Sequence, residues 1–495
     1  MSSSFRWIIL AVISSALLLV VIDMTVLYTA LPRLTHDLQA TATQKLWIVN
    51  AYPLTMAGLL ISMGVLNDRI GARSFFHLGL VIFGIASLAA AFSASAEMLI
   101  ASRALLAVGA AMMMPATMTI VRRAFDDPAE RSLAIGIWAA VASGGAALGP
   151  VIGGLLLEYF WWGSVFLINV PIVVLVLLFS LKLIPPIPGD HTRVFSLTAA
   201  VQIMAGLTGL IYAMKEFSKP SPQLSIALIA GVTGVMMTLL FVRKQQRSAS
   251  PMLDLALFGN RFFTAGVIAA MVSVACVIGV ELAVTQRLQL VLMMSPLLAG
   301  LFILPLPLAS FIAGPAVGWL VPHIGSLRAI QYSLLLSAAG LAVYLMVYDG
   351  ALWMTVVALA LTGAGLGGAM TAASTAIMLN SPENSSGTAA SIEGVAFELG
   401  GAMGITILGG ILAALYSYDM SAIPHLPVLA QDSIDGALIA AGSLMPAEGR
   451  VLLNLAEAAF SRGFVAVIGT SIAALLLTGV VLAVYSRKTV LKVTP

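Results

Sequence analysis

The chain has 495 residues, of which 60% are hydrophobic and only 9% are charged. A water-soluble domain of this length cannot cover its surface with so few charges, so the composition excludes a soluble globular protein. We therefore expect a polytopic membrane protein that lies in a lipid bilayer. The formal net charge of +3 reflects an uneven distribution of basic residues between loops, and we expect no nucleic-acid partner.

Helices that cross a bilayer need roughly 20 apolar residues each. The first apolar stretch is too long for a signal peptide and carries Asp23, so it stays as the first helix. On this scale the sequence predicts fourteen spans, at 7–31, 46–66, 75–95, 97–121, 132–157, 164–184, 196–216, 223–243, 263–286, 298–321, 328–348, 351–379, 388–416 and 463–485.

An even number of spans leaves both termini on one side of the membrane. With that side taken as the cytoplasm, most of the 24 Lys and Arg residues fall in cytoplasmic loops and tails, as the positive-inside rule requires. Lys215 is counted among the few basic residues on the outer side of the membrane. The single cysteine, Cys276, excludes an internal disulfide.

Two short loops share a pattern that indicates an internal repeat. GVLNDRIGAR at 64–73 follows the second span, and GWLVPHIGSLR at 318–328 follows the tenth. The offset pairs spans 1–6 with spans 9–14, an organisation typical of secondary transporters. We predict a six-helix unit at 1–195, a two-helix hairpin at 196–245 and a second six-helix unit at 246–495. The aligned positions are Gly64 with Gly318, Asp68 with Pro322, Arg69 with His323, and Gly71 with Gly325.

The segment 417–462 is predicted to lie outside the membrane between the last two spans. Its Ala and Leu content at 451–460 favours a short amphipathic helix, and an ordinary loop is the alternative.

The fifth predicted span contains five helix-breaking residues. Glycines at four-residue spacing let two helix backbones approach closely, and a proline inside a helix bends it. We therefore expect this helix to pack closely on a neighbour and to flex there, although an ordinary small-residue packing face is the alternative. The residues are Gly145, Gly149, Pro150, Gly153 and Gly154.

Four acidic residues and one arginine lie inside predicted spans: Asp23, Glu281, Glu393, Glu398 and Arg103. A charge facing lipid costs about 2.5–3.5 kcal/mol, so these residues mark the polar interior. Counted at 1.5 Å per residue, Asp23, Glu281 and Arg103 lie about 12, 8 and 9 Å inside their helix ends. Asp23 and Glu281 are expected to face each other across a pseudo-twofold axis. Glu393 and Glu398 point about 140° apart, so at most one faces the centre.

Each carboxylate is a candidate for binding protons and cations in competition, because burial favours its protonated form. The alternatives are a static ion pair with Arg103 and structural hydrogen bonds. Arg103 keeps its proton and is expected to bias a nearby acid. Aromatic rings inside spans can bind cations or serve in packing. No residue pattern indicates a metal site or a catalytic constellation. The candidate pocket aromatics are Tyr28, Trp47, Tyr52, Trp138 and Phe397.

The GxLxDRxGxR loop and the GxxxGPxxGG helix together resemble the major facilitator superfamily. With fourteen spans, DMTVLYTALP at 23–32 and WWGSVFLINVP at 161–171, the chain is similar to the fourteen-span drug:proton antiporter branch. The string around Glu393 and Glu398 is similar to that of bacterial methyl viologen and quaternary ammonium resistance exporters. This resemblance implies an all-α integral membrane fold of two six-helix bundles plus a two-helix insertion.

The resemblance also implies export of lipophilic cations from the cytoplasm by alternating access, driven by the proton gradient with no other cofactor. We expect a monomer in the inner membrane, with both termini cytoplasmic. An exporter or uptake permease of the same fold for an endogenous metabolite is the alternative. Family members carry Asn at the position of Tyr28 and Gln-Gly at Leu106-Ala107. The resemblance assigns the gating loop to Gly64, Asp68, Arg69, Gly71 and Arg73, and antiport to the segment from Gly145 to Pro150.

Overall fold

The computed structural model describes residues 3–217, 222–248, 251–423 and 426–490, and these residues form helices and loops without a strand. Thirteen of the described helices are long and apolar enough to cross a membrane, and the bent helix of the fifth span brings the number to fourteen. The predicted all-α membrane fold is therefore confirmed.

The first bundle contains seven helices. Three of these helices begin with a capping residue, Thr41, Ser95 or Asp127, whose side chain accepts a hydrogen bond from a backbone N–H group of the first turn. Its apolar side chains form one continuous core. The helices are α1 (Ser3–Asp37), α2 (Ala42–Ile70), α3 (Ala72–Ala91), α4 (Ala96–Ala124), α5 (Pro128–Tyr159), α6 (Ser164–Leu167) and α7 (Asn169–Leu183).

A helical hairpin follows, formed by α8 (Leu197–Phe217) and α9 (Leu224–Arg247). Helix α8 packs along α2 of the first bundle and also contacts α15 of the second. The first predicted domain boundary falls just before α8 and the second in the last turn of α9. Both boundaries stay predictions.

The second bundle has its own apolar core. Two π-helical turns, η2 and η4, interrupt its long helices. Its elements are η1 (Leu255–Gly259), α10 (Arg261–Gln286), η2 (Arg287–Val291), α11 (Pro296–Ile303), α12 (Pro305–Ile324), α13 (Ser326–Val347), α14 (Leu352–Leu379), η3 (Glu383–Ser385), α15 (Ser386–Met403), η4 (Gly404–Leu408), α16 (Gly409–Ser421), α17 (Val428–Asp432), α18 (Ile434–Ala441) and α19 (Pro446–Val490).

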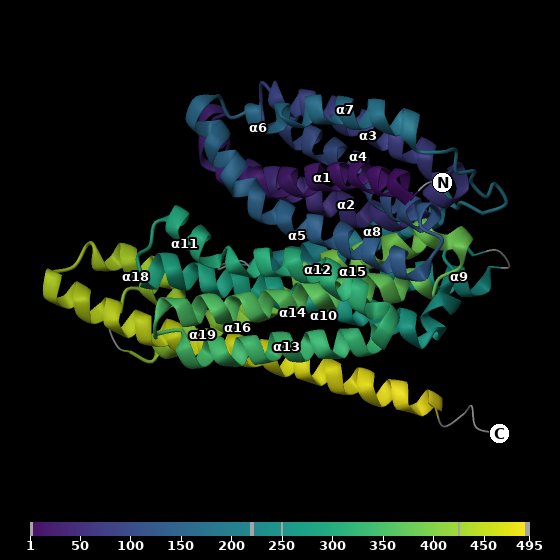
Figure 1. The fold of residues 1–495 in the computed structure, drawn as a ribbon. Helices are drawn as coiled ribbons and strands as arrows, with labels where there is room; N and C mark the ends of the chain where they lie inside the picture. Colours follow the sequence, from purple (N-terminus) through teal and green to yellow (C-terminus); the bar gives the residue numbers. More distant parts are fainter. Residues whose placement is uncertain (1–2, 218–221, 249–250, 424–425, 491–495) are drawn as a thin grey trace.

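The two bundles lie side by side, with the N- and C-termini at one end of the molecule (Figure 1). We call this end the termini end and the opposite one the far end. Near the termini end, Gly71 joins α2 to α3 and Gly325 joins α12 to α13, with φ values of 106° and 83°. These are the two described glycines with positive φ, a conformation that suits glycine. Their shared geometry supports the predicted repeat.

The segment at the far end differs from both alternatives considered for residues 451–460. These residues belong to α19, a single helix of 45 residues that begins at Pro446 and continues as the last span. The short helices α17 and α18 precede it, and the Tyr416 hydroxyl donates a hydrogen bond to the Ala430 carbonyl at 3.0 Å. Residues 451–460 are therefore helical, as one alternative predicted, but they form the first part of the long helix α19 instead of a separate short helix.

Helix α5 bends by 44° between the parts Pro128–Ala146 and Val151–Tyr159. Pro150 lies in the short segment between them. The bend agrees with the prediction from the proline, which removes one hydrogen bond from the helix.

Candidate functional site

Asp23 lies in a polar cluster enclosed by the first bundle. Its side chain is fully buried, and Oδ2 accepts a hydrogen bond from Arg103 Nη1 of α4 at 2.7 Å. Oδ1 accepts one from Asn169 Nδ2 of α7 at 3.0 Å, and the same amide donates to Ser87 Oγ of α3 at 3.3 Å. Four helices thus supply one buried ion pair and its hydrogen-bond partners. In this state the static pairing with Arg103 is formed.

Tyr52 of α2 covers this ion pair. The centre of its ring lies 4.7 Å from the Arg103 guanidinium carbon, and the Phe166 ring lies 6.0 Å from the same atom. The Tyr52 hydroxyl is buried without a hydrogen-bond partner among the described residues. It lies within electrostatic range of both Asp23 and Glu398 of the second bundle. Tyr52 is therefore an electrostatic neighbour of an acid of each bundle.

The three acids of the second bundle have different surroundings. Glu393 is buried and accepts a hydrogen bond from the Ser374 hydroxyl of α14. Glu398, five residues further along α15, is partly exposed and has no hydrogen-bond partner in the described part of the chain. Glu281, in the last third of α10, is exposed and has no hydrogen-bond partner in the described part of the chain. An exposed carboxylate without such a partner is available to a proton or to a cation.

The expected juxtaposition of Asp23 with Glu281 differs from this arrangement. Asp23 is enclosed and paired, whereas Glu281 makes no hydrogen bond or ion pair with any described residue. Glu398 is the second-bundle acid that shares an electrostatic neighbour, Tyr52, with Asp23. Equal depth in the membrane did not predict the partners of these side chains, because depth along a helix does not fix the direction in which a side chain points.

The other predicted pocket aromatics contact neighbouring helices, and their place in a pocket stays a prediction. Trp47 stacks on Tyr212 of α8, with ring centres 6.0 Å apart. Trp138 is buried and donates a hydrogen bond from Nε1 to Thr117 Oγ1 at 3.1 Å. Phe397 packs against the core of the second bundle. The side chain of Tyr28 lies outside the described residues.

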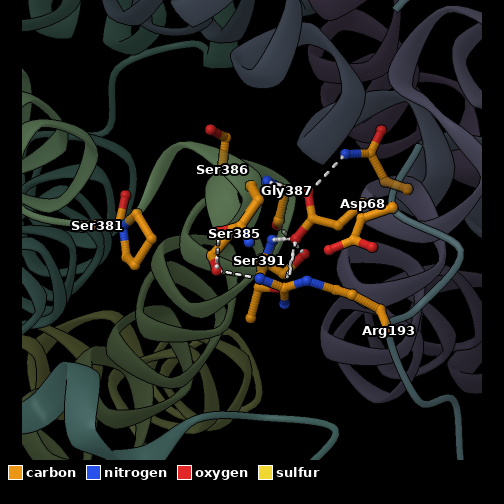
Figure 2. A network of polar contacts seen from close by, with 12 residues as sticks. Asp68, Arg193, Ser381, Ser385, Ser386, Gly387 and Ser391 are labelled. Carbon is orange, nitrogen blue, oxygen red and sulfur yellow. Dashed lines mark hydrogen bonds and ion pairs between the residues drawn. The ribbon is translucent and has the colours of Figure 1, made fainter. Parts of the chain in front are cut away.

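At the termini end, Asp68 of α2 caps a helix of the opposite bundle (Figure 2). Its carboxylate accepts hydrogen bonds from Gly387 N at 2.8 Å, from Thr388 N at 3.0 Å and from the Thr388 hydroxyl at 2.7 Å. These donors form the first turn of α15, where free N–H groups and the helix dipole favour a negative charge. Asp68 thereby ties the two bundles together.

Two arginines complete this contact, and sequence reasoning did not identify either as part of it. Arg122 of α4 donates to Ser381 Oγ at 2.8 Å, Ser381 O at 2.6 Å and Pro382 O at 3.3 Å, which lie just after α14. Arg193, in the segment between α7 and α8, lies 3.9 Å from Asp68 Oδ2 and also contacts the Ser385 hydroxyl. We call Asp68, Arg122, Arg193 and residues 381–388 the termini-end contact.

The predicted gating loop has several separate roles. A side chain at Gly64 would overlap Ser391 and the Gly387 carbonyl, so glycine permits α2 to touch α15. One at Gly71 would overlap the Ile187 carbonyl. Arg73 donates to the Leu181 carbonyl at 2.7 Å within the first bundle. Arg69 makes no hydrogen bond or ion pair with any described residue. Arg193, rather than Arg69, pairs with Asp68.

The second seam between the bundles also uses glycines. A Cβ at Gly136 of α5 would lie 2.6 Å from the Gly314 carbonyl of α12, and one at Gly318 would lie 2.5 Å from the Ser132 carbonyl. Further along, the Ser143 and Ser310 hydroxyls are 3.0 Å apart. The described hydrogen bonds between α1–α7 and α10–α19 thus extend from the termini end to about the middle of the molecule.

The predicted glycine helix packs on α1. A side chain at Gly149 would overlap Thr25, and one at Gly145 or Gly153 would press on α1 within about 3 Å. A Cβ at Gly154 would meet nothing within 4 Å, so this glycine lies outside the close contact. The close packing predicted for the helix is therefore present within the first bundle, at the bend of α5.

These features define a membrane transporter: two pseudo-symmetric helical bundles meet at one end, and ionisable side chains lie at membrane depth between their helices. Among the described residues, no group of three or more His, Cys, Asp or Glu side chains is arranged to hold a metal ion.

Comparison with known proteins identifies the family. A family model described as Major Facilitator Superfamily matches residues 13–405. The chain belongs to the major facilitator superfamily, and the predicted membership is confirmed. It is therefore a transporter and a multi-pass membrane protein, not an enzyme.

Three matches cover most of the chain. The methyl viologen resistance protein SmvA of Salmonella typhimurium is 39% identical over 460 residues, which cover 92% of this chain and 93% of that protein. The multidrug efflux pump LfrA of Mycolicibacterium smegmatis is 37% identical over 462 residues, or 92% of each. The human organic anion transporter MFSD10 has a similar fold, with a TM-score of 0.63 and 15% identity over 96% of this chain and 100% of that chain.

Proposed function

We propose that the protein is a proton-coupled antiporter that exports lipophilic cations, such as quaternary ammonium biocides, methyl viologen and dyes, by alternating access. The relatives named for methyl viologen resistance and multidrug efflux support this function. We further propose that it acts as a monomer in the inner membrane, with both termini in the cytoplasm and the proton gradient as its energy source.

The observation that carries the proposal is the pair of accessible carboxylates at Glu281 and Glu398. Neither has a hydrogen-bond partner among the described residues, so each is available to a proton or to a cationic ligand. One site that binds either ion, but not both, couples the two fluxes, because the arrival of one favours release of the other. The enclosed Asp23–Arg103 pair is a third charged element of the same coupling.

The termini-end contact is the proposed cytoplasmic gate. With the termini in the cytoplasm, this contact closes the path to the cytoplasm and leaves the far end as the open side. Separation of Asp68 and Arg122 from residues 381–388 would let the bundles rock and expose the acids to the cytoplasm. In that inward-open state the acids would release protons to the cytoplasm and bind the cation. After the termini-end contact forms again, protons from outside would displace the cation at the far end.

Export is tested in intact cells that express the protein, by following ethidium accumulation with and without a protonophore. We expect lower accumulation than in cells without the protein, and loss of this difference with protonophore or with Glu398→Gln. Glu158→Gln, at an exposed glutamate near the end of α5, is the matched control and should export normally. Equal accumulation with and without the well-folded protein, across a panel of cations, would contradict the proposal. Faster accumulation would favour an uptake permease.

A further inference from the structure

Helix α8 lies across the boundary between the two bundles. On α2 it meets Trp47 through Tyr212, and the Thr208 hydroxyl donates to the Leu54 carbonyl at 3.4 Å. On the second bundle, the Thr406 hydroxyl donates to the Met214 carbonyl at 2.8 Å. Thr406 lies in the π-helical turn η4, an interruption of regular helix that is frequent at functional sites. Helix α8 of the hairpin therefore makes hydrogen bonds to both bundles.

A small apolar cluster holds α8 beside Glu398. Leu54 and Ala57 of α2, Ile211 of α8 and Ala402 of α15 form its buried centre. The neighbours packed against it are Tyr212, Met214 and Leu399. Leu399 follows Glu398 in the chain and Met214 precedes Lys215, so this packing brings the lysine and the glutamate to the same region.

Lys215, whose sequence position near the end of the span 196–216 indicates the membrane side opposite the termini, directs its charge toward this region. It belongs to the last turn of α8, and its Nζ donates to Asn50 Oδ1 of α2 at 2.8 Å. Its ammonium lies within electrostatic range of the Glu398 carboxylate. Tyr52 is also an electrostatic neighbour of Glu398, and it is neutral as a phenol.

We propose that Lys215 is the resident counter-cation of Glu398 and sets the charge selectivity of the transport site. This inference rests on the proposed export of cations. A substrate cation near Glu398 is attracted by the carboxylate and repelled by the ammonium, and the repulsion doubles for a dication. Lys215 thus disfavours dications relative to monocations, and it acts through position and charge without bonding the substrate.

The experiment measures binding of monovalent ethidium and divalent methyl viologen to purified protein in nanodiscs. Lys215→Met should tighten ethidium binding about tenfold and methyl viologen binding about a hundredfold. This is the order that Coulomb's law gives for unit charges about 10 Å apart at an effective dielectric of about 20. The ratio of the two dissociation constants then shifts about tenfold toward the dication, and this ratio is insensitive to the fraction of active protein. Lys215→Arg should keep the wild-type ratio.

Three further variants separate charge from structure. Lys244→Met removes a hairpin lysine that bonds Ser196 at the termini end and should leave the ratio unchanged. Asn50→Asp replaces the amide that Lys215 contacts by a carboxylate of nearly equal size. It should neutralise the lysine and shift the ratio in the same direction as Lys215→Met, and it serves as the test if Lys215→Met folds poorly. In a Glu398→Gln background no carboxylate holds a cation beside Lys215, so Lys215→Met should not change the ratio of the two dissociation constants.

An unchanged ratio in both Lys215→Met and Asn50→Asp would overturn this inference, as would a shift that persists without Glu398. If the wild-type protein binds and exports both probes while the ratio does not move, the proposed function stands and only the role of Lys215 falls. If the folded wild type neither binds nor exports any cation, the proposed function falls, and this inference with it.

Discussion

Replacement of Asp68 by asparagine should open the termini-end contact. The carboxylate accepts three hydrogen bonds from Gly387 and Thr388 at 2.7–3.0 Å, and it is almost fully buried. An asparagine of the same size keeps one acceptor oxygen and turns an N–H group toward the other donors. It also removes the negative charge that faces Arg193 and the start of α15.

The size of this effect follows from the contacts. A hydrogen bond to a charged group contributes about 1.5–3 kcal/mol, and a charge at a helix N-terminus about 0.3–1 kcal/mol. Loss of one such bond and of the charge therefore weakens the closed state by about 2–4 kcal/mol. At about 1.4 kcal/mol per factor of ten, the ratio of closed to open molecules falls about 30- to 1000-fold.

Double electron–electron resonance, which measures distances between spin labels, tests this opening of the termini-end contact directly. Labels on cysteines at Ala129 of α5 and Asn384 before α15, both exposed, report the separation of the bundles. Cys276 is the single native cysteine and is replaced by serine. Asp68→Asn should move the distribution to longer distances than in the unsubstituted protein.

The matched control is Asp190→Asn, which lies beside the contact because its backbone N–H donates to the Asp68 carbonyl at 2.9 Å, a bond that the side-chain change leaves in place. The Asp190 side chain is partly exposed, and its carboxylate accepts hydrogen bonds from the Thr192 hydroxyl and N–H, which hold the pKa of this carboxyl below its usual range. It carries a full charge but makes no described bond to the second bundle, so its loss should leave the distances unchanged. Identical distributions for Asp68→Asn and the unsubstituted protein would refute the assignment of Asp68 to the gate.

Two further substitutions test the first bundle. Gly149→Ala places a methyl group on Thr25 and should destabilise the protein by about 1–3 kcal/mol. Gly154→Ala is the control, because its methyl group enters open space. Melting curves of the two solubilised variants measure the difference, and equal curves would count against the close α1–α5 contact. Asp23→Asn leaves Arg103 buried without its charged partner and should destabilise the protein by about 3–5 kcal/mol. The double variant Asp23→Asn/Arg103→Gln should recover much of the melting temperature but not the resistance of cells to dications. Wild-type resistance in the single or the double variant would exclude a coupling role for Asp23.

Much of the fold follows from local sequence. Hydropathy predicted the spans because each helix has to satisfy its backbone hydrogen bonds within lipid, and this requirement acts on every helix alone. The repeated loops predicted a shared conformation, which Gly71 and Gly325 adopt. The glycines of α5 predicted close packing because no other residue permits that approach, although the neighbour, α1, was not evident from the sequence.

The site was less predictable because its contacts join distant segments. Arg122 lies 259 residues from Ser381, and Arg193 lies 192 residues from Ser385. Which arginine reaches which carbonyl depends on how the bundles pack, and this has no local signal. For Trp47 and Trp138, which were expected at a pocket, the neighbouring side chains Tyr212 and Thr117 also depend on how the helices pack. Lys215 lies near the end of a predicted span, and its contact with Asn50 of α2 was not evident from the sequence.

The most direct test of the account is proton movement in inverted membrane vesicles that carry a pH-sensitive dye. After respiration acidifies the lumen, addition of ethidium or a bis-quaternary biocide should cause rapid alkalinisation that is absent in vesicles without the protein and in Glu398→Gln vesicles. The absence of any response across a broad panel of cations, with the protein shown to be folded, would contradict proton-coupled cation antiport.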